Sequence, residues 1–147
     1  MHNVVAYSAQ NARRTMAIFF KLDFKGEYMS IRKFFKDLNI PDKDYVVTAD
    51  QIIFKNSLNL YGCTSLGSLP EGLTVGGSLY LGGCTKLTSL SEGLTVGGSL
   101  YLNGCTSLGS LPKDLNIKNI YVNGDQLKLI EFIKNSDKFK NKLKING

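Results

Sequence analysis

Apolar residues recur through the middle of the chain with a period of 21 residues. Residues 73–81 return unchanged as residues 94–102, and related copies precede and follow these two. Each copy contains a short Leu-x-Leu segment, and this alternation of apolar and polar positions indicates a half-buried strand. A copy of this length is too short to bury its own apolar face, so neighbouring copies are expected to stack. The pattern therefore predicts an α/β repeat solenoid with a short parallel sheet.

The predicted strands and the turns before them are defined by leucines and glycines. The strand positions are Leu58, Leu60, Leu79, Leu81, Leu100 and Leu102, with Ile120 and Val122 in a diverged fourth copy. Pro70 and Pro112 break any long helix on the return path, which should be extended or form a short 3₁₀ turn. The Gly-Gly pairs at 76–77 and 97–98 predict tight turns at positive φ, where a side chain would be costly.

The regions on either side of the repeats have different patterns. Residues 18–24 alternate as a strand and residues 28–38 have helical spacing, so residues 1–49 are predicted to form an α+β cap. The repeats are predicted over residues 50–124. In the C-terminal region, residues 125–147, Leu127, Ile130 and Phe132 or Ile133 suggest a helical stripe, followed by lysines. We expect a basic helical cap there, because an open stack needs both ends covered.

Composition fits one domain, and the charge is unevenly distributed. The chain has 147 residues, 43% hydrophobic residues and a net charge of +6. Residues 1–55 carry 9 Lys/Arg against 6 Asp/Glu, residues 56–112 carry 1 against 2, and residues 113–147 carry 8 against 4. The repeats are thus almost neutral and the ends basic. Without a long apolar run or a secretory signal, we expect no membrane association and a cytoplasmic location, in the producing or a host cell; export by a specialised apparatus stays open.

Three cysteines occupy equivalent positions in three copies, and they predict structure rather than chemistry. Cys63, Cys84 and Cys105 have the spacing of the repeat itself, and His2 is the only histidine. Metal sites usually show close cysteine pairs with histidines nearby, so a column of small buried thiols is the favoured interpretation. There is also no Ser-His-Asp or Cys-His arrangement and no phosphate-binding glycine loop. We expect no enzymatic activity, no metal and no cofactor.

The repeat resembles those of leucine-rich repeat proteins. Residues 79–87 resemble the Leu-x-Leu-x-x-Asn/Cys core of that family, with Cys84 at the Asn/Cys position, and residues 68–73 resemble the short Leu-Pro-containing repeats of bacterial effectors. The resemblance covers roughly residues 52–124. It implies a protein-binding role, as in a bacterial or phage inhibitor or effector that acts on a host protein or defence complex. Gly76 and Gly97 depart from the family pattern, which has leucine there.

The outward positions of the predicted sheet provide the candidate binding surface. Large amphipathic rings held on a rigid sheet lose little entropy on binding, which is why tyrosine is common in interface hot spots. The candidate partner-binding residues are Asn59, Tyr61, Tyr80, Tyr101, Asn103, Tyr121 and Asn123. Alternatively, stacked tyrosines merely stabilise the strands and were copied by duplication. Tyr121 is the stronger indication, because it persists in the diverged copy.

The basic ends supply a second set of candidate contacts. These are Arg13, Arg14, Arg32, Lys33, Lys134, Lys138 and Lys140. They could contact nucleic acid or an acidic protein, or simply form a solvated face that also blunts a sheet edge. The leading hypothesis is a non-enzymatic protein-protein interaction module, monomeric or weakly self-associating. The alternative is a nucleic-acid-binding protein whose basic flanks contact phosphates while its tyrosines stack on single-stranded bases.

Overall fold

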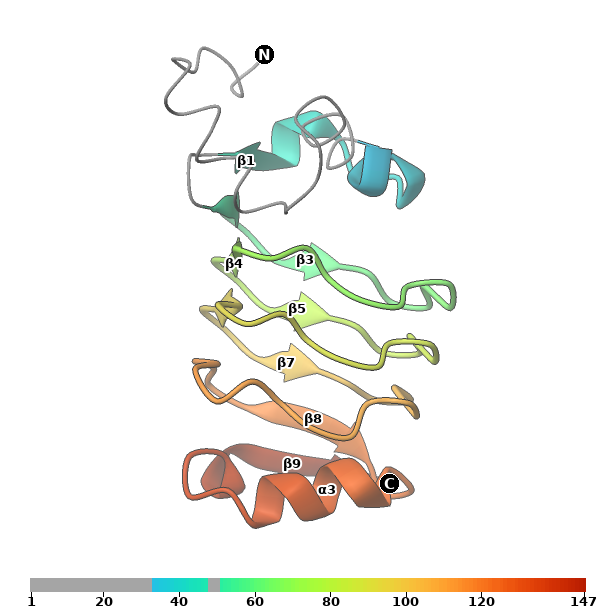
Figure 1. The fold of residues 1–147 in the computed structure, drawn as a ribbon, viewed down its shortest axis with the longest axis vertical. Coiled ribbons are helices and arrows are strands. Elements are labelled where there is room, and N and C mark those ends of the chain that lie inside the picture. The colour runs from blue at the N-terminus through green and yellow to red at the C-terminus, as the bar shows by residue number, and fades with distance from the viewer. Residues whose placement is uncertain (1–32, 48–50) are drawn as a thin grey trace.

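Parallel and mixed β-sheets with few helices make up a small α/β fold (Figure 1). The computed structural model describes residues 33–47 and 51–147. The strand expected over residues 18–24, the first five residues of the helix expected over 28–38, and Arg13, Arg14 and Arg32 lie outside the described residues. Residues 33–37 are helical, as the spacing predicts.

Two sheets account for the repeated part of the chain. The first has the order β1 (Tyr45–Val47), β2 (Ile52–Phe54), β4 (Leu73–Val75), β6 (Thr95–Val96). The second has the order β3 (Leu58–Asn59), β5 (Leu79–Tyr80), β7 (Leu100–Tyr101), β8 (Ile120–Asn123), β9 (Leu143–Asn146). Figure 1 shows the strands of the second sheet one below another along the long axis. Its pairings are all parallel.

The parallel pairing of the Leu-x-Leu segments is confirmed, whereas the first sheet was not predicted. Leu58 pairs with Leu79 and Leu79 with Leu100, each one 21-residue period apart. The return path, expected to be extended or turned, pairs as well: β2, β4 and β6 are parallel neighbours. Residues such as Val75 and Val96 favour this, because β-branched side chains pack well on a pleated surface.

The core lies between the two sheets and consists largely of leucine columns. Both sheets contribute buried residues at every copy, and the intervening loops contribute more. The buried leucines are Leu58, Leu60, Leu66, Leu69, Leu73, Leu79, Leu81, Leu87, Leu90, Leu94, Leu100, Leu102, Leu108, Leu111, Leu115 and Leu129. Since burying one leucine contributes about 1.5–3 kcal/mol, the stacked copies depend on one another for most of their stability.

The Gly-Gly pairs serve a different purpose from the one predicted. None of these four glycines has a positive φ; within the repeats, positive φ angles occur at Gly62, Gly72, Gly83, Gly93 and Gly104 in the loops. The pairs lie instead where one copy touches the next. A Cβ on Gly97 would collide with the carbonyl oxygen of Gly76, and one on Gly76 with that of Lys55. Close backbone approach, not turn conformation, therefore requires glycine there.

Different secondary-structure elements cover the two ends of the stack. At the N-terminal end a helical segment, residues 33–37, and a short 3₁₀ helix, η1 (Asp42–Asp44), precede β1, which pairs antiparallel with β2. The rings of Phe35, Tyr45 and Phe54 pack together, with centroids 4.6–5.4 Å apart. This aromatic cluster covers the first copy with large apolar area.

At the C-terminal end the cap is a helix together with a strand. The helix α3 (Leu127–Lys134) buries Leu129, Ile130 and Ile133. The stripe predicted from the sequence was wrong for Leu127, which is 70% exposed. A 3₁₀ helix, η2 (Lys140–Lys142), leads into β9, which extends the second sheet. The sequence predicts a helical cap over residues 125–147, so the strand β9 was not predicted. The alternation of apolar and polar residues in Leu143–Asn146 indicates this strand.

Gln126 joins this cap to the repeats. Among the residues that the structure describes, it is the one buried polar side chain. Its Nε2 donates to the carbonyls of Leu102 and Cys105 at 2.8 and 3.2 Å, and its Oε1 accepts from the backbone N–H of Asn123 and Gly104 at 2.6 and 3.2 Å. Its bond to the carbonyl of Leu102 matches the contacts of Cys84 and Cys105 with the carbonyls of Leu60 and Leu81, so Gln126 takes the place of the cysteine in the fourth copy. Its amide is fully satisfied, as a buried polar group requires.

The close approach at the Gly-Gly pairs gives a stability prediction. Gly97→Ala should lower the free energy of unfolding by about 1–3 kcal/mol, because the new methyl group has to displace the backbone of the preceding copy. Gly109→Ala is the matched control, since a Cβ there meets nothing within 4 Å. Urea unfolding followed by circular dichroism measures both, and equal destabilisation by the two substitutions would contradict this account.

Candidate functional site: the tyrosine ladder

Three tyrosines line up across the second sheet, and we call Tyr80, Tyr101 and Tyr121 the tyrosine ladder. Each lies between buried residues of its strand, so its side chain points away from the core. The register pairs Tyr80 with Tyr101 and Tyr101 with Tyr121, as the sequence predicts, and Asn59 pairs with Tyr80 at one end. Asn59 and the three tyrosines thus form one column across the sheet.

The rings of the ladder stack face to face. The ring centroids of Tyr80 and Tyr101 are 4.5 Å apart with planes 12° from parallel, and those of Tyr101 and Tyr121 are 4.5 Å apart with planes 5° from parallel. Both faces of the central ring are therefore covered by its neighbours. What the ladder offers to a partner is its ring edges and a row of hydroxyl groups.

Stacking also changes the acidity of the central hydroxyl. Desolvation raises the pKa of Tyr101 above its usual value, and negative charge on Tyr121 or Tyr80 at high pH would raise it further. The hydroxyl of Tyr101 therefore stays protonated at physiological pH and remains a hydrogen-bond donor.

Columns of small polar side chains flank the ladder and fix it in place. On one side, the hydroxyl of Ser57 accepts from the backbone N–H of Ser78 at 2.9 Å, and that of Ser78 from Ser99 at 3.0 Å. On the other side, Nδ2 of Asn103 donates to Oδ1 of Asn123 at 3.0 Å. These bonds run from one copy to the next, so they tie the face together along the stack.

Tyr61 lies apart from the ladder and covers a glycine. Its side chain is 73% exposed, and its backbone N–H donates to Oδ1 of Asn59 at 2.9 Å. A Cβ on Gly82 would lie 2.8 Å from two carbon atoms of the Tyr61 ring. The ring thus lies over Gly82 at the edge of the face, where it is the most exposed large apolar surface of the described chain.

Sequence reasoning missed the last member of the column. In β9, Lys144 pairs with Tyr121 and Asn146 with Asn123, and both β9 residues are exposed. The otherwise uncharged face therefore ends in a cation. The 21-residue period does not reach Lys144, because it lies 23 residues after Tyr121; only the strand-like alternation of Leu143–Asn146 could have indicated it.

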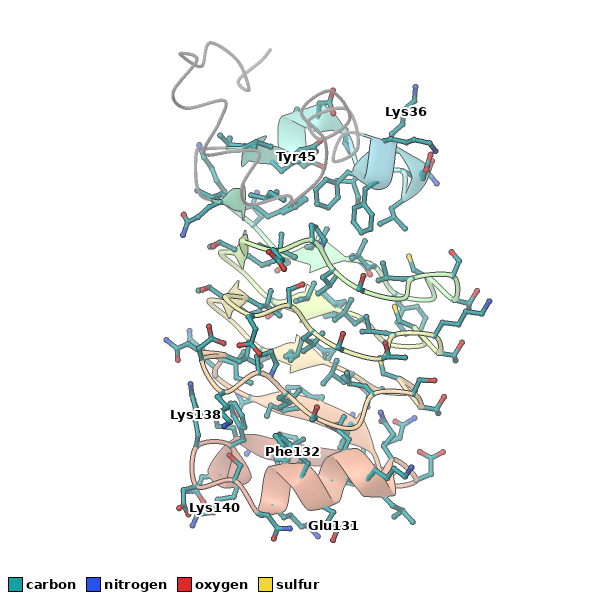
Figure 2. All side chains as sticks on the ribbon, in the orientation of Figure 1. Lys36, Tyr45, Glu131, Phe132, Lys138 and Lys140 are labelled. Atoms are coloured by element: carbon teal, nitrogen blue, oxygen red, sulfur yellow. The ribbon has the colours of Figure 1, made fainter. Side chains whose placement is uncertain are left out.

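The basic candidates do not join the ladder into one surface. Figure 2 shows Lys36, near Lys33 in sequence, at one end of the long axis and Lys138 and Lys140 towards the other. Lys33 forms an ion pair with Asp37, and Lys140 with Asp137, each at 2.6 Å. The ammonium of Lys138 donates to the carbonyl of Lys113 at 2.8 Å. Lys134 is exposed on the last turn of α3.

The cysteine column is inward-facing and hydrogen-bonded. Cys84 and Cys105 are buried, whereas Cys63 is half-buried. The thiols of Cys84 and Cys105 contact the carbonyls of Leu60 and Leu81 at 3.2 and 3.0 Å. Burial raises the pKa of Cys105 to about 12, so this thiol is protonated at neutral pH. No group of three or more metal-binding side chains occurs in the part of the chain that the structure describes.

Comparison with known proteins gives no assignment. No family model matches the chain, and neither a curated protein nor a solved structure is significantly similar to it. Within residues 33–47 and 51–147, no helix is sufficiently long and apolar to span a bilayer.

The raised pKa of Tyr101 can be measured directly. We expect Tyr101→Phe to remove phenolate absorbance mainly from the part of the alkaline titration above pH 10.0, the ordinary value for tyrosine, because ionisation of the central ring is disfavoured. Difference absorbance of the folded protein against pH, with circular dichroism to confirm folding at each point, is the measurement. Loss of amplitude mainly below that pH would contradict the proposed desolvation.

Proposed function

We propose that the protein is a non-enzymatic binding module, a leucine-rich-repeat-like solenoid that engages another protein through the tyrosine ladder and the residues beside it. The observation that carries the proposal is the stacked ladder itself, held between two hydrogen-bonded polar columns. The solenoid part of the proposal is supported by strands that pair one 21-residue period apart in both sheets. Repeat architectures of this kind commonly bind through one extended face.

The ladder is suited to protein binding because its side chains are already ordered. A free tyrosine loses rotamer entropy when a partner immobilises it, at a cost of about 0.5–1.5 kcal/mol per side chain. Here neighbouring rings and backbone register fix Tyr101 before any partner arrives. The neutral face also carries no charge that would have to be desolvated, apart from Lys144 at its end.

Nucleic-acid binding receives less support from the geometry. Base stacking needs a free ring face, and the central ring of the ladder has both faces covered. Lys33 and Lys140 are each paired with a carboxylate, which reduces the charge that they offer to a phosphate. A salt titration of single-stranded oligonucleotide binding tests this alternative, because phosphate contacts would give a steep fall in affinity with salt.

Partner capture with ladder variants tests the proposal. The immobilised full chain should recover a specific protein from lysate of the producing or host cell, identified by mass spectrometry. We expect Tyr80→Ser with Tyr121→Ser to lower the affinity for that protein by about tenfold or more, because loss of hot-spot tyrosines typically costs 2 kcal/mol or more. The purified pair is then measured by calorimetry.

A charge variant is the control for the same measurement. Lys134→Glu with Lys140→Glu reverses two exposed charges in the C-terminal region and leaves the ladder intact. It should change the affinity little. If the ladder variant bound normally while the charge variant did not, the partner would contact the basic end, and the proposed role of the ladder would be wrong.

A further inference from the structure

A hollow of about 590 Å³ lies between α3, the segment that follows it and the return path of the third copy. Its apolar lining consists of Leu111, Phe132 and Phe139. Leu111 and Phe139 are buried in the core, whereas Phe132 is half-buried and leaves part of its ring open. Figure 2 shows Phe132 on α3 and Lys138 in the segment after it, next to the last repeat. This volume lies within the range of about 300–1,000 Å³ that is usual for ligand sites.

The rim of this hollow is predominantly cationic. Lys113, Lys128 and Lys138 line it together with a single carboxylate, Glu131. Lys138 is held in place, because its Nζ bonds to the carbonyl of Lys113 at 2.8 Å and lies 5.6 Å from the centre of the Phe139 ring. An ammonium group has three N–H donors, so a fixed Lys138 can still donate to a ligand. Lys113, Lys128 and Glu131 are exposed.

We propose that this hollow binds an acidic peptide segment of a protein partner, with an apolar or aromatic side chain against Phe132 and flanking carboxylates on the lysine rim. Three lysines against one glutamate give the complementary charge, and the apolar floor requires an apolar group beside the carboxylates. The site is independent of the tyrosine ladder and does not rest on the function proposed for it.

The floor of the hollow separates this ligand from a phosphate chain. A nucleic acid would be held by the lysines alone, and the aromatic rings would contribute only through stacked bases. Phe139 is buried, and the open part of the Phe132 ring lies within the hollow. An apolar side chain inserted there removes water from the Phe132 ring, whereas a hydrated phosphate does not. Recognition of an acidic apolar peptide uses both parts of the site.

A pair of blocked peptides tests the proposal on the full chain. The first has one phenylalanine with two aspartates on either side, and the second has asparagine in place of every aspartate. With ¹⁵N-labelled protein, the acidic peptide should shift the amide signals of Leu111, Lys113 and residues 128–139, and it should bind about tenfold or more tightly than the neutral one at low salt. Inorganic pyrophosphate is the third probe and should bind more weakly than the acidic peptide.

Two substitutions on α3 should act in opposite directions. Lys128→Gln should weaken binding of the acidic peptide by about two- to fivefold, and Glu131→Gln should strengthen it by a similar factor, as expected for exposed charges. Both positions are exposed, so folding should be unaffected. Lys86→Gln, in a loop of the second copy, should change nothing. Equal binding of both peptides, pyrophosphate binding as tight as the acidic peptide, shifts centred elsewhere, or weaker binding after Glu131→Gln would each overturn the proposal.

Discussion

The distance between paired strands, about 4.8 Å, constrains nearly every other feature of this protein. Because equivalent residues of successive copies have to lie one strand spacing apart, each position is packed against its own counterpart. Gly97 is required where the carbonyl of Gly76 passes, since a side chain would not fit between the two turns. The tyrosine rings follow the same spacing and stack at 4.5 Å. The strand spacing thus explains both why glycine is required at position 97 and why the tyrosine rings stack.

At the C-terminal end of the stack, side chains replace part of the backbone pairing between copies. At the C-terminal end the fourth copy has diverged, and side chains from the cap take over backbone bonding. Gln126 serves four backbone groups of the third and fourth copies, and Lys138 and Lys142 donate to the carbonyls of Lys113 and Ile117. Backbone groups without a partner are costly where water is excluded, so the buried and half-buried contacts of Gln126 and Lys142 stabilise the end of the stack.

The sequence predicted those parts of the fold that depend on periodicity. A repeated leucine pattern defines the register, and the column from Asn59 to Tyr121 follows from it. The first sheet could not be predicted, because Leu73–Val75 is apolar enough to be buried as a coil or as a strand. The role of the Gly-Gly pairs was also beyond reach, since both a positive φ and close approach favour glycine, and only the distances separate them.

The sequence alone does not indicate which lysines bond to other groups of the protein and which remain free to contact a partner. Eight lysines in residues 113–147 suggest a broadly basic surface. However, Lys138 and Lys142 are bonded to carbonyls and Lys140 to Asp137, so part of this charge stabilises the cap. A lysine that holds a backbone carbonyl loses entropy once, during folding, and is then available as a fixed cation.

The candidate surfaces consequently differ in kind. The tyrosine ladder is uncharged and rigid because the repeat imposes its spacing, whereas the hollow beside α3 is cationic because lysines of the cap and of the third copy surround the open part of the Phe132 ring. A partner that matched one would not match the other, since ring edges and hydroxyls favour a neutral polar surface and the lysine rim favours carboxylates. Duplication of further copies would lengthen the ladder and leave the hollow unchanged, so the two surfaces can evolve separately.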